Sequence, residues 1–202
     1  MTIPVCVEAG KKRVFASALD WPGWCRSGKS VPEALAALEA YEPRYRLVAT
    51  AAAEALPKTL AFEVVESLPG NATTEFGAPG IVASSELQPL TPAAGRRLAA
   101  LLRATWQVLD GVGAHAPAEL RKGPRGGGRD TPAVLEHVYG AEDVYLRQVG
   151  IRLKDWAARR EALLTLLESG ADPAGKWPLG YCVRRTAWHA LDHAWEIEDR
   201  SQ

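Results

Sequence analysis

Two histidines near the C-terminus are spaced for metal chemistry. His189 and His193, within the stretch WHALDHAWE, are four residues apart, so on an α-helix their side chains lie one above the other on the same face. Two neutral imidazoles in that arrangement can chelate one divalent ion, because their nitrogens can converge at metal-ligand distance. The same spacing also arises by chance, since histidines on a helix surface need no metal. The pair by itself leaves both interpretations open.

The helix that carries this pair is expected to be buried. A polar stripe follows the side of His189 at about 3.6 residues per turn, and it consists of Cys182, Arg185, His189, His193, Glu196 and Arg200. The opposite side is apolar and consists of Val183, Ala187, Ala190, Leu191 and Ala194. Because Trp188 and Trp195 add a further apolar flank, the stripe lies between apolar surfaces. Charges in a buried stripe must be paired or must serve chemistry.

Three charged residues of the stripe are candidates for direct roles. The guanidinium groups of Arg185 and Arg200 have the geometry to hold the carboxylate of a substrate or cofactor through two hydrogen bonds. Glu196 either orients His193 as a ligand or acts as a base, or else forms an ion pair with Arg200, four residues further on. Glu196 and Arg185 are therefore the candidate catalytic residues. Asp192 is either a supporting group for the ligands or a solvated charge.

A third histidine, His137, lies in the segment TPAVLEHVYGAEDVYLRQ. On a helix it shares a face with Ala133, Val134, Ala141 and Val144, which we expect to face the core. A single histidine there is more often a hydrogen-bonded core residue than a ligand, but an HxxxH pair on another buried helix favours the metal interpretation. Three imidazoles with one open position form a catalytic metal site. Zinc, nickel, copper and iron all suit such ligands, and zinc or nickel is the expected ion.

Strand-like and helix-like segments share the first third of the chain. Short runs rich in Val, Ile, Phe and Ala predict strands over 3–9, 13–19, 24–27 and 60–68. Ser30 is expected to cap a helix, with Glu33 completing a capping box. Pro43 is expected to interrupt that helix before a second one over 45–56. The segment 70–92, rich in helix and strand breakers, is expected to contain the domain boundary.

From about residue 90 the pattern becomes helical. Helices are predicted over 91–111, 131–150, 154–169 and 178–200, and the glycine-rich stretch 123–128 is interpreted as a flexible loop rather than a phosphate site. The predicted fold is α+β: a small N-terminal β-β-β-α(-β) domain over 1–80, followed by a C-terminal antiparallel four-helix bundle over 90–202. The remaining histidine, His115, falls in a predicted loop and receives no role.

The overall composition argues against several classes of function. Lys plus Arg equals Asp plus Glu at 24 each, so no broad nucleic-acid surface is expected. No apolar run has the length of a signal peptide or membrane span. The cysteines, Cys6, Cys25 and Cys182, form no disulfide or metal motif, so we expect reduced thiols and a cytoplasmic location. A small-molecule substrate is the expected partner, and a homodimer is expected because such bundles often pair.

The residues around the histidines resemble a known superfamily. The C-terminal region, roughly 90–200, is similar to the DinB-like superfamily of metal-binding four-helix bundles in EHVYGAEDVYLRQVG and in RRTAWHALDHAWEIEDR. The resemblance implies that His137, His189 and His193 bind a divalent metal. Characterised members include thiol-dependent S-transferases and isomerases that use mycothiol, bacillithiol or glutathione. A low-molecular-weight thiol is therefore a second implied cofactor.

The N-terminal region, roughly 3–55, resembles the HicB-like antitoxin domain. The matching stretch is FASALDWPGWCRSGKSVPEALAALEAY, which is predicted to form a strand, an aspartate-aromatic-Pro-Gly turn, a short strand and a capped helix. No recognisable DNA-binding module follows it, which departs from the antitoxin pattern. We therefore expect a reused fold that docks a partner or covers a substrate.

Two classes of function follow from these features. The first is a metal enzyme, either a thiol-dependent S-transferase or a metal-dependent hydrolase, whose ion binds a thiolate or activates water. The alternative is a non-enzymatic regulatory or partner-binding protein that uses the HicB-like domain, with the metal structural or absent.

Overall fold

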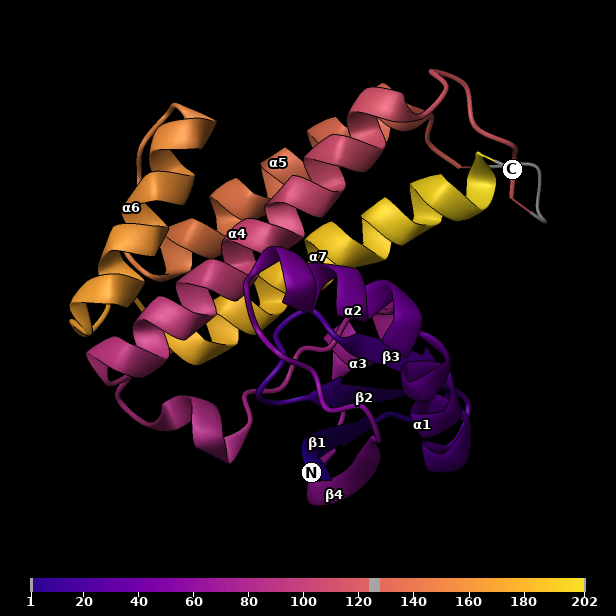
Figure 1. The fold of residues 1–202 in the computed structure, drawn as a ribbon, viewed down its shortest axis with the longest axis horizontal. Helices are drawn as coiled ribbons and strands as arrows, with labels where there is room; N and C mark the ends of the chain where they lie inside the picture. The colour runs from indigo at the N-terminus through magenta and orange to yellow at the C-terminus, as the bar shows by residue number, and fades with distance from the viewer. Residues whose placement is uncertain (1, 124–127, 202) are drawn as a thin grey trace.

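The computed structural model describes residues 2–123 and 128–201, and Figure 1 shows its fold. The predicted glycine-rich loop at 123–128 therefore lies largely outside the described residues. Within them the chain has the predicted α+β class, with an N-terminal four-stranded sheet and its helices followed by a group of C-terminal helices.

The N-terminal sheet consists of β1 (Thr2–Ala9), β2 (Val14–Ala18), β3 (Cys25–Gly28) and β4 (Ala61–Pro69). β1, β2 and β3 pair antiparallel, and β4 pairs parallel with the other side of β1, which gives the order β3-β2-β1-β4. The four predicted strands are confirmed to within one residue at each end. Their apolar runs are bounded by turn residues, which is why the sequence pattern located them.

Two helices, α1 (Val31–Ala40) and α2 (Glu42–Ala51), connect β3 to β4. The Ser30 hydroxyl accepts from the N–H of Glu33 as predicted, but the Glu33 carboxylate accepts from the N–H of Lys29 instead of that of Ser30. The predicted start of the second helix at 45 is wrong, because Pro43 lies in the first turn of α2, where no donor is needed. The predicted end at 56 is also wrong, since the chain leaves α2 through Ala53 at a φ of 56°.

Four helices make up the C-terminal part: α4 (Pro92–His115), α5 (Thr131–Gln148), α6 (Trp156–Ser169) and α7 (Leu179–Arg200). α4 and α7 run in the same direction, and α5 runs against them (Figure 1). Contacts at both ends agree with this direction. At the start of α7, Gly180 lies against Glu86, which shortly precedes α4. At the end of α7, the carbonyl of Arg200 accepts from the N–H of Arg121, which shortly follows α4. None of the described helices is long and apolar enough to cross a membrane.

The apolar core continues from the sheet into the C-terminal helices. Trp24, Leu38 and Tyr45 of the N-terminal part form one buried cluster with Leu101 of α4 and Trp195 of α7. A second buried cluster lies among α4, α5, α6 and α7. α7 contributes to both clusters, so the two predicted domains are packed against each other through this helix.

The segment between β4 and α4 contains two short elements that the sequence pattern did not predict, α3 (Ala72–Phe76) and the 3-10 helix η1 (Ser84–Leu87). The buried Glu8 carboxylate on β1 holds this segment against the sheet, because it accepts from the Thr74 hydroxyl and from the N–H groups of Gly80 and Ile81. A buried charge satisfied by several donors is stable in the interior. These contacts explain why a breaker-rich segment follows an ordered path.

A buried ion pair anchors η1 to α7. Arg184 donates through Nε and Nη2 to the two carboxylate oxygens of Glu86, at 2.6 and 3.0 Å, and through Nη2 to the carbonyl of Ile81. Both side chains are buried. The pair therefore fixes the start of α7 relative to the sheet.

We predict that Glu86→Ala lowers the free energy of unfolding by about 3–5 kcal/mol, because it leaves the Arg184 guanidinium buried without its partner. Urea denaturation of the chelator-treated protein measures this loss. Glu168→Ala is the control, since Glu168 pairs with Arg103 at the surface and its loss should cost less than about 1 kcal/mol. Equal, small losses for both variants would show that the buried pair does not anchor α7.

Candidate metal centre

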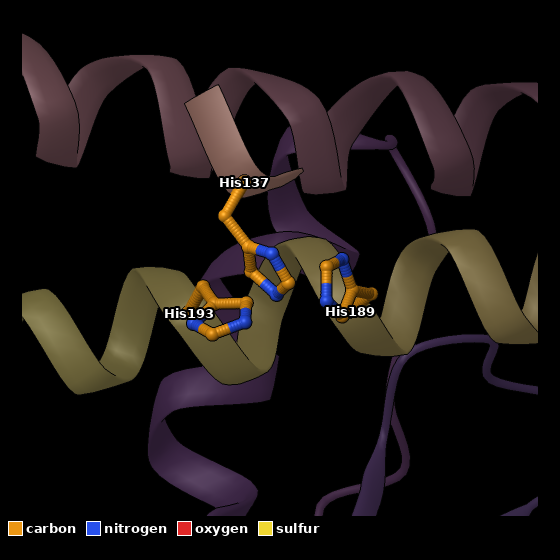
Figure 2. Close-up of side chains that lie close together, drawn as sticks. All are labelled: His137, His189 and His193. Atoms are coloured by element: carbon orange, nitrogen blue, oxygen red, sulfur yellow. The ribbon is translucent and has the colours of Figure 1, made fainter. Parts of the chain in front are cut away.

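The three predicted histidines come together in the structure. One ligand atom from each of His137, His189 and His193 can be chosen so that all three lie within 4.8 Å of one another. Their ring centroids are 5.0 Å apart for His137–His189, 5.0 Å for His137–His193 and 4.6 Å for His189–His193. Figure 2 shows the two rings on α7 with the ring of His137 reaching toward them from α5. His137 thus joins a cluster with two histidines that lie more than 50 positions further along the chain.

α7 is buried along nearly its whole length, as the sequence predicted, and it presents His189 and His193 on the face that packs against α5. The predicted orientation of α5 was partly wrong. Ala133 and Val144, expected in the core, are exposed, and Val144 exposes 55% of its surface. Val134, which was also expected in the core, is buried, and the buried stripe of α5 continues at Val138. His137 therefore lies at the margin of the packed face, beside Val138, where its ring can reach α7.

Burial favours the neutral form of His189 and of His137. The pKa of His189 falls to about 2, chiefly because burial disfavours its charged form and secondarily because His193, His137 and Arg185 would repel a second positive charge. Burial also lowers the pKa of His137, with Arg129 and His193 adding to the effect. A neutral imidazole has a free nitrogen lone pair, which is the form that binds metal.

His189 has a buried nitrogen that the protein leaves unsatisfied. Its Nδ1 has no hydrogen-bond partner among residues 2–123 and 128–201. Buried polar atoms without a partner are rare, and a ligand, water or ion commonly satisfies them. The donor set of three imidazoles, together with this orphaned atom, fits a borderline-soft divalent ion such as zinc or nickel.

Glu196 connects the site to the end of α7. One of its carboxylate oxygens lies 2.7 Å from Nδ1 of His193, and the other accepts from Nη1 of Arg200 at 2.7 Å. The first contact lowers the pKa of Glu196 most, and the Arg200 charge adds to it. The predicted ion pair with Arg200 is confirmed, and the contact with His193 is the one that the predicted orienting role would use. With Nδ1 of His193 engaged, its Nε2 is the nitrogen left for a metal.

The other residues of the predicted stripe occupy different surroundings. Arg200 also donates through Nε to the carbonyl of Arg121, so its guanidinium is bonded both to Glu196 and to the segment after α4. Cys182 is buried, and burial raises the pKa of its thiol to about 12, which keeps it protonated and unsuited as a ligand. Asp192 pairs with Arg26 of β3 at 2.8 Å and thereby joins α7 to the sheet. His115 is exposed at the end of α4.

Arg185 lies one turn before His189, buried to all but 7% of its surface. Its guanidinium carbon is 5.2 Å from the ring centroid of Tyr145 and 4.8 Å from that of Trp188. Those two rings also contact His189, at centroid distances of 5.8 and 5.9 Å. The sequence did not predict that Tyr145 and Trp188 together contact Arg185 and His189, because Tyr145 comes from α5 and its approach to α7 depends on tertiary packing.

Comparisons of the chain with protein-family models, with curated proteins and with solved structures find no match.

The low pKa of His189 predicts acid sensitivity in the metal-free protein. Above about pH 6.5 the side chain is neutral in both states, and below it only the unfolded chain takes up the proton. The free energy of unfolding should therefore fall by up to about 1.4 kcal/mol per pH unit between pH 6.5 and 5 on account of His189. Urea denaturation of chelator-treated protein across this range measures the slope.

His189→Gln should flatten that pH dependence, whereas the exposed His115→Gln should leave it unchanged. An identical slope in the parent protein and His189→Gln would contradict the assignment of the acid sensitivity to His189.

Proposed function

We propose that this chain binds a divalent metal ion, zinc or nickel, through His137, His189 and His193, and that it uses the ion in chemistry on a small molecule. The observation that carries the proposal is the convergence of three imidazoles from two helices within 4.8 Å. Burial, which keeps His189 neutral, supports it further. Three protein ligands leave a coordination position open, which is typical of catalytic rather than structural sites.

A bound divalent ion would supply a Lewis acid at whose open position water or a thiol loses its proton near neutral pH. The chain's own residues hold and shield the ligands. Glu196 accepts from Nδ1–H of His193 and so selects the tautomer with a free Nε2. The rings of Tyr145 and Trp188 enclose one side of His189 and keep water away from it.

We extend the proposal to a thiol-dependent S-transferase built on a DinB-like four-helix bundle, with a metal-dependent hydrolase as the second choice of reaction. The resemblance in the spacing of the histidines, around His137 and in the α7 pair, supports this choice. The N-terminal sheet, proposed as a HicB-like unit, would then steady α7 through the Arg26–Asp192 pair. In the regulatory alternative the same unit would instead bind a partner.

Untagged protein should bind about one equivalent of zinc or nickel, because the site has one set of three ligands. His189→Ala and His193→Ala should each abolish tight binding. A chelator should lower the melting temperature of the parent and of a control with an intact site but not that of either variant, since an ion that binds the native state stabilises it. Metal analysis and thermal melts measure both effects, with His115→Ala as the control. A metal content below about a tenth of an equivalent per protein, with the same content in His193→Ala, would refute the metal site.

The reaction class has its own test. Metal-loaded protein is assayed with glutathione, mycothiol or bacillithiol and an aromatic halide, and separately with an activated ester for hydrolysis. We expect thiol conjugation that disappears in His193→Ala, because the thiol needs the ion to become a thiolate near neutral pH. Metal-loaded protein that conjugates no thiol and hydrolyses no ester would favour the regulatory alternative.

A further inference from the structure

One of the buried arginines differs from the rest. Four arginines of the described residues are buried, namely Arg159, Arg160, Arg184 and Arg185. The first three each donate to a carboxylate: Arg159 to Asp143, Arg160 to Glu142 and Arg184 to Glu86. Arg185 forms no ion pair with any of the described residues, and its Nη1 is fully enclosed without a hydrogen-bond partner.

A buried guanidinium without an anion is costly, because it has left water and gained no compensating charge. The guanidinium of Arg185 contacts the rings of Tyr145 and Trp188, and these contacts supply no carboxylate or carbonyl oxygen to accept from its N–H groups. Arg185 keeps 7% of its surface exposed. Its enclosed Nη1 has no hydrogen-bond acceptor among the described residues, so the side chain has a donor that an anion could satisfy.

The position of Arg185 connects it with the histidine cluster. It precedes His189 by four residues on the same face of α7, and both residues contact the rings of Tyr145 and Trp188. A ligand bonded to Arg185 would thus lie beside the imidazoles.

We propose that Arg185 is an anion-binding residue and that the molecule accepted beside His189 carries a carboxylate. The planar fork of a guanidinium matches the two oxygens of a carboxylate and forms paired, charge-assisted hydrogen bonds with them. This inference deepens the proposed function, on which it rests for the chemistry at the neighbouring metal. Anion binding by Arg185 does not require a bound metal, so the anion-binding proposal and the metal-binding proposal can each be refuted without the other.

Arg185→Met tests the proposal in chelator-treated protein, with Arg184→Met as the matched buried control. Without added anion, Arg185→Met should melt no lower than the parent, because it removes an uncompensated charge and keeps much of the apolar volume. Arg184→Met should melt lower, because it leaves Glu86 buried alone. A loss of stability in Arg185→Met comparable to that in Arg184→Met would assign Arg185 a structural role and overturn the proposal.

The second readout is stabilisation by a probe anion. Acetate, compared with chloride at equal ionic strength, should raise the melting temperature of the parent, and Arg185→Met should bind acetate roughly tenfold or more weakly. Acetamide, which has the same shape without the charge, should stabilise neither protein. Equal stabilisation of both proteins by acetate would overturn the proposal, and a stronger effect of inorganic phosphate than of acetate would overturn the carboxylate assignment.

Discussion

The burial of α7 is the constraint on which the rest of the structure depends. This helix packs against the sheet on one side and against α4 and α5 on the others, yet it carries a full complement of charged and titratable side chains. A buried charge needs a partner, and the surrounding elements supply several. Glu86 comes from the segment before α4, Arg26 comes from β3, and Glu196 is held within α7 itself by Arg200. Nδ1 of His189 and Nη1 of Arg185 are left without such partners and lie one turn apart, and Oγ1 of Thr186 and Nη2 of Arg200 on the same helix are also enclosed without a partner among the described residues.

The same burial connects the two proposals. An ion held by the three imidazoles would add positive charge to a region of low dielectric that already contains the Arg185 guanidinium, and Glu196 would contribute one carboxylate beside it. A carboxylate-bearing ligand would offset that excess charge and satisfy Arg185 at once. The site would therefore attract anions more strongly with the ion bound than without it, which couples ligand selection to metal loading through electrostatics.

The sequence predicted those features that depend on local periodicity and missed those that depend on tertiary contacts. The polar stripe of α7 repeats with the helix, so it could be read from spacing alone. The side of α5 that faces α7 could not, and the prediction included Val144, which is exposed. α3 and η1 lie in a breaker-rich stretch, and their order comes from Glu8 and Arg184, residues distant in the sequence. The unpaired state of Arg185 is likewise visible only once its neighbours are known.

X-ray absorption spectroscopy at the metal edge of zinc-loaded protein tests the central claim most directly. We expect three imidazole nitrogens at about 2.0–2.1 Å, one further light-atom ligand and no sulfur in the absence of added thiol. His137→Ala should lower the number of imidazole scatterers, which shows that α5 contributes a ligand. A spectrum with sulfur ligands, or one without imidazole scattering, would contradict a metal centre formed by these two helices.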